Sequence, residues 1–307
     1  MSGAGVTSEA KARSEPAEQA LPVPVADADG ISTSYRVVGS GPPLLMLSPG
    51  GFNATMDNWS SFGRYRQLRM VEHLSSRFSC VLFDRRESGE SGGRLEVLGW
   101  ERYAAQANAL LDRLGWSSAH VLGGCAGCSV ALALARRYPT SVRSLILFSP
   151  AGGPSYRLAQ HGRFSRHLAF LEEHGPAAVA ELAASTGGSF SWDPRLGPWA
   201  AVLRSDPQFA DRYAGTDVRS HTVMVTGTAR AMFDRDTVPG AEPEELMNLR
   251  TPALIFPGRD DSHATSAARY LEECLPEQEY VDLPVDAQDE SLVAERTLEF
   301  LSRTERS

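Results

Sequence analysis

Residues 119–135 read Ala-His-Val-Leu-Gly-Gly-Cys-Ala-Gly-Cys-Ser-Val-Ala-Leu-Ala-Leu-Ala. The stretch begins as an apolar strand, passes through a tight glycine turn and continues as a helix. The glycines permit a strained turn in which strand and helix backbones pass close together. The turn exposes the Cys125 side chain above the sheet and at a helix N-terminus, where the dipole favours a thiolate. We therefore expect Cys125 to be a nucleophile; the alternative is a small buried apolar residue.

Length and composition bound the class of protein. A chain of 307 residues suits one large α/β domain with an insertion. The net charge of −8, without a basic cluster, argues against a nucleic-acid partner. No apolar run reaches the roughly 18 residues of a membrane helix, residues 1–20 lack a signal-peptide layout, and four cysteines make no disulfide framework. We expect a cytoplasmic protein with no membrane partner and a disordered tail over residues 1–20.

Apolar strands alternate with amphipathic helices along the chain. Besides the strand before Cys125, strands are predicted at residues 31–38, 44–48, 78–84, 144–149, 252–258 and 279–284, and helices at 65–74, 101–114 and 292–301. Because most of these strands are apolar on both faces, they predict a mostly parallel, doubly wound sheet of about eight strands covered by helices.

The hundred or so residues before the strand at 252–258 have a helical pattern and no obvious strand. We predict an α/β core domain formed by residues 21–151 and 249–307. Residues 152–248 are predicted to form a helical lid inserted into that core.

Four segments together resemble the α/β-hydrolase superfamily, in particular its lidded members such as meta-cleavage-product hydrolases and esterases. They are Ser48-Pro-Gly-Gly-Phe52, Asp84-Arg-Arg-Glu-Ser-Gly-Glu-Ser91, the Gly-x-Cys-x-Gly turn around Cys125, and Gly258-Arg-Asp-Asp261. The resemblance extends over nearly the whole chain from about Val23.

The resemblance implies roles for several residues. An oxyanion hole would use the N–H of Ala126 and an N–H from the Gly50-Gly51 turn. Asp261 stands where the family places its catalytic carboxylate, whereas we interpret the neighbouring Asp260 as a capping or surface charge.

The general base is the departure from the family pattern. The family places its histidine after the last strand, and here residues 283–293 (Leu-Pro-Val-Asp-Ala-Gln-Asp-Glu-Ser-Leu-Val) contain none. His263 is a nearby substitute that could reach Cys125 or bind substrate; an exposed loop histidine is the equal alternative.

The walls of the pocket are less determined by the sequence. Phe52, Trp192 and Phe233 are candidate substrate contacts, although aromatic residues there are as often lid packing. Glu87 replaces the usual glycine of its turn and could contact a substrate. No metal cluster or phosphate-binding loop is present in the sequence, so we expect no cofactor and a small-molecule substrate. A homodimer is compatible with the sequence.

Two functions follow from this pattern. The first is a cysteine hydrolase or acyltransferase that opens an ester, thioester or lactone, or catalyses the reverse cyclisation. Dienelactone hydrolases resemble it in using a cysteine on this scaffold. The alternative is a non-hydrolytic catalyst of natural-product biosynthesis, for addition, cyclisation, epimerisation or C–C bond formation, because deacylation is slow without a fixed histidine.

Two further readings remain open. Cys125-Ala-Gly-Cys128 has the C-x-x-C spacing of redox proteins, and these two thiols could form a disulfide. A catalytically inactive binding protein is the other.

Overall fold

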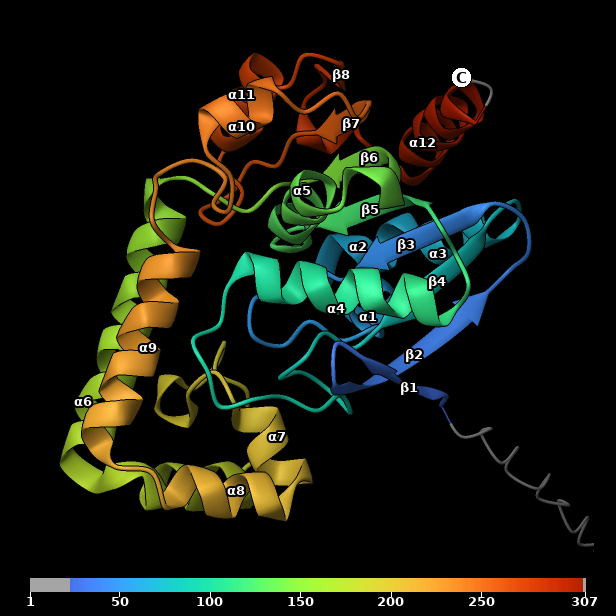
Figure 1. Ribbon diagram of the computed structural model, residues 1–307. Coiled ribbons are helices and arrows are strands. Elements are labelled where there is room, and N and C mark those ends of the chain that lie inside the picture. The colour runs from blue at the N-terminus through green and yellow to red at the C-terminus, as the bar shows by residue number, and fades with distance from the viewer. Residues whose placement is uncertain (1–22, 306–307) are drawn as a thin grey trace, which may run out of the picture.

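The computed structural model describes residues 23–305 (Figure 1). The tail predicted for residues 1–20 lies outside this range. Within it, no helix combines the length and apolar character needed to cross a membrane.

An eight-stranded sheet forms the centre of the molecule. Its strands lie in the order β1-β2-β4-β3-β5-β6-β7-β8. β1 is antiparallel to β2, β2 is antiparallel to β4, and the other neighbours are parallel. The bounds are β1 (Val25–Ala28), β2 (Ile31–Val38), β3 (Pro43–Leu47), β4 (Ser79–Phe83), β5 (Ala119–Gly124), β6 (Val142–Phe148), β7 (Ala253–Phe256) and β8 (Gln278–Tyr280). The predicted fold class is confirmed, and β1 is the strand that the sequence did not indicate.

Helices cover both faces of this sheet (Figure 1). α4 and α5 pack on each other on one face, and α12 packs on α2 and α3 on the other. The bounds are α1 (Asn58–Ser61), α2 (Gly63–Leu68), α3 (Met70–Ser75), α4 (Trp100–Arg113), α5 (Gly127–Arg137), α10 (Pro243–Met247), α11 (Thr265–Cys274) and α12 (Glu290–Thr304). The single helix predicted over 65–74 is two helices, because Arg69 between them has a left-handed backbone with φ 45°.

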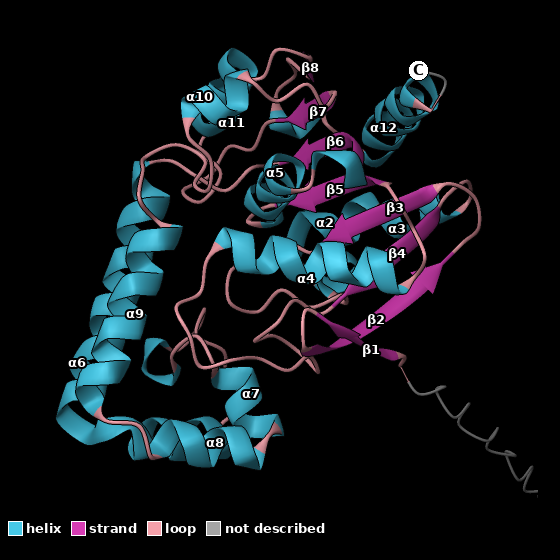
Figure 2. Cartoon of the chain, viewed as in Figure 1, coloured by secondary structure: helices cyan, strands magenta, loops and turns pink. Residues whose placement is uncertain are grey.

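The segment between β6 and β7 is helical and adds no strand to the sheet (Figure 2). It contains α6 (Pro154–Ser185), α7 (Ala200–Ser205), α8 (Pro207–Ala214) and α9 (Val218–Met232), and ends with α10. We call residues 154–247 the helical insertion. α6 bends at Gly175 and Pro176, because Gly175 leaves the helical conformation and a proline cannot donate to the helix ladder. α6 and α9 lie side by side along one end of the sheet.

β5 lies in the middle of the sheet, and all six of its residues are buried. Both of its neighbours, β3 and β6, are parallel to it. Ligand sites of parallel sheets lie at the carboxyl ends of the strands, and Cys125 directly follows the carboxyl end of β5.

Candidate active site

Cys125 occupies a strained turn between β5 and α5. Its φ of 55° lies in the left-handed region, which a residue with a side chain rarely adopts. Glycines make the turn possible. A Cβ at Gly123 would lie 2.6 Å from the carbonyl oxygen of Gly127, and one at Gly127 would lie 2.2 Å from that of Leu47. The neighbouring strand holds Cys125 in this conformation, since the Cys125 N–H donates to the Phe148 carbonyl at 3.1 Å.

Backbone N–H groups surround the sulfur. Those of Gly50 and Ala126 both stabilise its ionised form. Gly50 has a φ of 105°, and its loop is fixed by the Asn58 amide, which donates to the carbonyls of Pro49 and Asn53 at 2.7 Å each. Two backbone donors therefore meet at the sulfur, in the arrangement that an oxyanion hole needs.

The loop between β7 and α11 brings His263 to the same place. Nδ1 of His263 lies 2.9 Å from both carboxylate oxygens of Asp260. Nε2 is buried and has no conventional hydrogen-bond partner within the described residues, and the Cys125 thiol is the group that interacts with this imidazole. In space, the imidazole of His263 thus lies between Cys125 and Asp260.

Hydrogen bonds of the main chain hold this loop in place. The Asp260 carboxylate accepts from the backbone N–H groups of Ser262 at 2.8 Å and His263 at 3.0 Å. Gly152 N–H donates to the Ser262 carbonyl at 2.9 Å. Gly258 lets the loop close, because a Cβ there would lie 2.4 Å from that of His263.

The thiol and the imidazole shift each other toward their charged forms. Burial of the sulfur opposes ionisation, but the nearby imidazole of His263, its charge and the two backbone N–H groups outweigh it and lower the pKa of Cys125. Burial likewise disfavours the imidazolium of His263, yet Cys125 and Asp260 raise its pKa to about 9. The pair therefore favours thiolate and imidazolium at neutral pH.

Cys125 and His263 line a cavity of about 300 Å³. The other lining residues come from the oxyanion loop, α1 and the turn after it, the helical insertion and the loop after β7: Gly50, Gly51, Asn53, Asn58, Phe62, Tyr156, Gln160, Arg163, Ser191, Trp192 and Ser262. Cys125 is 9% exposed and lines this space. It is open to a small molecule rather than sealed in the core.

Comparison with known proteins identifies the family. A family model described as alpha/beta hydrolase fold matches residues 42–286, which is most of the chain. The chain belongs to the α/β-hydrolase family. It is a hydrolase-fold enzyme.

Curated relatives of this α/β-hydrolase are distant. The presumed carbamate hydrolase RutD of Azorhizobium caulinodans is 26% identical over 260 residues, which cover 83% of this chain and 86% of that one. The dihydrolipoyllysine-residue acetyltransferase component of the acetoin cleaving system of Cupriavidus necator is 32% identical over 127 residues. That match covers 41% of this chain and only 32% of the relative.

Solved structures share the fold of this α/β-hydrolase. The enol-lactonase from Burkholderia xenovorans LB400 superposes with a TM-score of 0.59 at 21% identity, over 91% of this chain and all of that one. A meta-cleavage product hydrolase from Pseudomonas fluorescens IP01 gives 0.57 at 18% identity, over 91% and 97%.

The acid predicted at Asp261 is one residue away from the carboxylate that contacts the histidine. Asp260, interpreted from the sequence as a capping or surface charge, both caps the loop and binds His263. Asp261 is exposed, and its side chain forms no hydrogen bond or ion pair with Cys125 or His263 within residues 23–305. The tight turn from Asp260 to His263, closed by the bond from His263 N–H to the Asp260 carbonyl at 3.2 Å, places the Asp260 carboxylate against the imidazole.

A glutamine fills the region where the family places its histidine. Gln288, after β8, is 2% exposed, and its amide donates to the carbonyls of Leu283 at 3.1 Å and Pro257 at 3.3 Å. Arg64 donates to its backbone carbonyl at 2.6 Å. This loop therefore has a structural role in the α/β-hydrolase.

Three predicted substrate contacts lie away from the cavity. Phe52 and Phe233 are buried against each other and against Phe164, because the helical insertion packs an aromatic cluster over this edge of the core. Glu87 is 2% exposed and accepts from Arg86 Nε at 3.0 Å and Arg94 N–H at 3.1 Å.

Trp192 does line the cavity and is 79% exposed at its mouth. The sequence did not indicate Gln160 and Arg163, because their place depends on how the insertion docks.

The C-x-x-C spacing does not form a bond here. Cys125 and Cys128 are both free thiols. Cys128 is fully buried and donates to the Gly123 carbonyl at 3.1 Å, away from the cavity. Burial raises its pKa well above the ordinary thiol value, so this geometry supports a packing role for Cys128.

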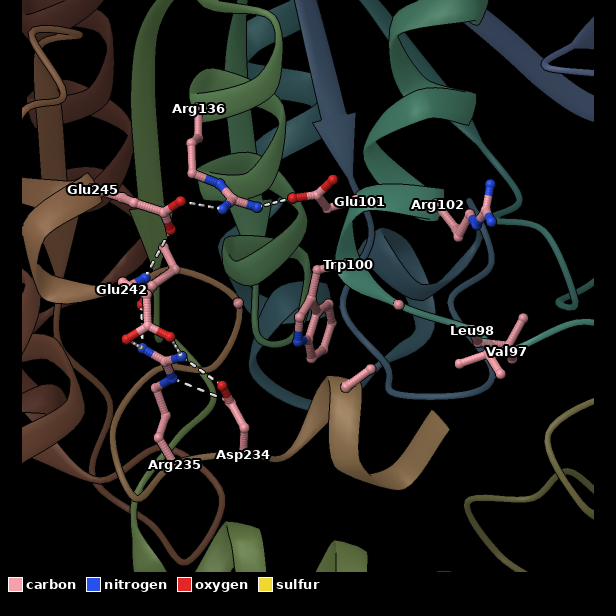
Figure 3. A pocket seen from close by; sticks show the side chains of 14 residues that line it. Val97, Leu98, Trp100, Glu101, Arg102, Arg136, Asp234, Arg235, Glu242 and Glu245 are labelled. Carbon is pink, nitrogen blue, oxygen red and sulfur yellow. Dashed lines mark hydrogen bonds and ion pairs between the residues drawn. The ribbon is translucent and has the colours of Figure 1, made fainter. Parts of the chain in front are cut away.

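A second hollow, of about 440 Å³, lies between α4, α5 and residues 234–245 (Figure 3). Two of its arginines pair with carboxylates of the same hollow. Arg136 binds Glu101 and Glu245, and Arg235 binds Asp234 and Glu242. We therefore assign it to attachment of the insertion. No group of three or more metal-ligating side chains occurs within the described residues.

Proposed function

We propose that this α/β-hydrolase cleaves an ester, thioester or lactone, or transfers its acyl group, with Cys125 as nucleophile. His263 is the general acid and base, Asp260 orients it, and the N–H groups of Ala126 and the Gly50-Gly51 turn bind the oxyanion. The observation that carries the proposal is the position of His263, which bonds to Asp260 through Nδ1 and lines the same cavity as Cys125, whose thiol raises the pKa of the imidazole.

Acylation follows from this arrangement. The Cys125 thiolate attacks the substrate carbonyl, a C–S bond forms, and the carbonyl oxygen becomes an oxyanion beside the backbone N–H groups. When the oxyanion collapses, the bond to the leaving oxygen or sulfur breaks. The imidazolium of His263 protonates the leaving group through Nε2.

Deacylation uses the same residues in reverse. Neutral His263 takes a proton from water, and the hydroxide formed attacks the thioester carbonyl. The C–S bond then breaks and the acid departs, leaving thiolate and imidazolium. Asp260 stabilises that imidazolium through Nδ1 in both half-reactions. In acyl transfer, an acceptor hydroxyl or amine replaces the water.

The experiment is an assay of small p-nitrophenyl esters and acyl thioesters with trapping of the acyl-enzyme. We expect acid-quenched protein to carry one acyl group on Cys125 by peptide mass spectrometry. Cys125→Ala should abolish the adduct and turnover, whereas Cys274→Ala, a thiol far along the chain in α11, should retain both. Equal turnover by the wild type and Cys125→Ala would remove covalent catalysis from consideration.

The same assay addresses the non-hydrolytic alternative. That alternative was based on the lack of a histidine after the last strand, and a histidine beside Cys125 weakens it. Steady ester or thioester hydrolysis favours our proposal. A stable acyl-enzyme that forms but does not hydrolyse would favour transfer or a non-hydrolytic reaction.

A further inference from the structure

The cavity above Cys125 has a cationic wall without an acidic counterpart. Arg163, on α6, is half-buried and lines it, and none of the lining residues is Asp or Glu. Within residues 23–305 no carboxylate forms an ion pair with Arg163. Burial lowers the pKa of its guanidinium. Buried cations in proteins are normally paired, so a missing partner has to be explained.

The neutral contacts of Arg163 orient it without neutralising it. Nη1 donates to the side-chain oxygen of Gln160, and Nη2 donates to the Ser191 carbonyl at 3.2 Å. A guanidinium has five N–H donors, so three are left for another acceptor. Gln160 is itself 7% exposed and lines the cavity, so the guanidinium is held against this space.

A second guanidinium adds to the positive potential. Arg85 is 4% exposed, and its Nε has no hydrogen-bond partner among the described residues. Nη2 of Arg85 donates to the Gly50 carbonyl at 3.3 Å, and the guanidinium lies over the Tyr103 ring. Because its positive charge lies behind the oxyanion loop, it favours a negatively charged ligand in front of that loop.

Tyr156 relates Arg163 to the reactive sulfur. This tyrosine lines the cavity, and it is close enough to feel the charges of Cys125, Arg85 and Arg163. Cys125, Tyr156 and Arg163 therefore line one cavity, and the tyrosine is near both the sulfur and the guanidinium.

We propose that the substrate is a carboxylic acid whose reactive carbonyl lies a few bonds from its carboxylate, and that Arg163 and Gln160 bind that carboxylate. This inference rests on the proposed function, because it names the substrate class of the same site. Carboxylate fits the planar fork of a guanidinium, which can donate two parallel hydrogen bonds to it. The cavity volume, at the small end of ligand pockets, suits a compact acid.

The test compares two alkylating probes that differ only in charge, N-bromoacetylglycine and N-bromoacetylglycinamide. Rates at Cys125 are followed by peptide mass spectrometry and divided by the rates with glutathione. We expect wild type to prefer the acid by about ten-fold, which corresponds to about 1.4 kcal/mol. Arg163→Gln should lower the preference to about one, and Arg163→Lys should retain part of it.

Arg166→Gln is the matched control, because it removes the same charge from an exposed position three residues along α6, outside the cavity. It should leave the preference unchanged. An equal preference in wild type and Arg163→Gln would overturn the inference while leaving the nucleophile intact.

A second measurement does not depend on the reactivity of the sulfur. Calorimetry should show tighter binding of phenylacetate than of phenylacetamide, and Arg163→Gln should abolish the difference. If Cys125 reacts with neither alkylating probe, the proposed function fails, and the binding result alone decides whether Arg163 forms a carboxylate site. Equal binding of the two ligands would overturn the carboxylate site.

Discussion

Nδ1 of His263 lies 2.9 Å from both carboxylate oxygens of Asp260, which is only three residues earlier in the chain. The loop after β7 therefore supplies both the candidate base and the group that orients it. The turn is fixed by its own backbone hydrogen bonds and by Gly152, so the pair does not depend on the last strand and its loop.

Asp260→Asn should reduce kcat for ester cleavage by about 10- to 100-fold. Asparagine keeps an oxygen for the backbone N–H groups of the loop but removes the charge that stabilises the imidazolium. The loss of kcat should be smaller than for substitution of a buried carboxylate, because the Asp260 side chain is 63% exposed. Asp261→Asn is the control and should remain within two-fold. A lower pKa of His263 in Asp260→Asn, measured by NMR titration, separates this role from a structural one.

Gly50→Ala should lower activity by about 100-fold. A Cβ there would lie 2.7 Å from the Asn53 carbonyl oxygen, and the φ of 105° disfavours any residue with a side chain. The loop must shift, and its N–H leaves the oxyanion. Gly51→Ala meets only the Ser191 hydroxyl, at 3.9 Å, and should keep most of the activity. Equal effects of the two alanines on kcat would argue against a role for this loop.

Gln288→Ala should destabilise the fold by about 1–3 kcal/mol in urea unfolding. The substitution leaves the buried Pro257 carbonyl and the part-buried Leu283 carbonyl without their donor, which costs more than the loss of an exposed hydrogen bond. Asn248→Ala removes an exposed amide that bonds to the Glu244 carbonyl, and should cost less than about 0.5 kcal/mol. A loss for Gln288→Ala as small as for this control would contradict the structural role.

His167 should make the protein less stable in acid. Burial in the helical insertion lowers its pKa to about 4, so the unfolded chain, whose histidine titrates near 6.5, binds the proton more tightly. Its contribution to stability is therefore full above pH 6.5 and is lost as the pH falls toward 4. The contribution of His167 to the free energy of unfolding should drop by about 2 kcal/mol between pH 7.5 and pH 5.

His167→Gln should remove that drop, whatever it does to stability at pH 7.5. His174→Gln alters a histidine whose side chain is 45% exposed, and should leave the drop in place. Identical acid dependence in the wild type and His167→Gln would show that other groups cause it.

The sequence predicts the parts of the fold that local chemistry determines. The glycines around Cys125 predict the elbow because their Cβ positions are sterically forbidden, and the apolar strands predict the parallel sheet. The choice between Asp260 and Asp261 depends on how one turn closes, which spacing alone does not settle. Arg163 reaches the cavity only through the docking of the helical insertion, and Phe52 packs beneath it for the same reason.

The most direct test of the account is the pH dependence of Cys125 alkylation by iodoacetamide in the wild type and in His263→Gln. The pKa of Cys125 is lowered, whereas burial raises that of Cys80 to about 12, so the wild type should be labelled at Cys125 alone near neutral pH. The apparent pKa of that reaction should lie below the ordinary thiol value in the wild type and rise above it in His263→Gln. The same apparent pKa in both proteins, at or above the ordinary value, would contradict the thiolate–imidazolium pair.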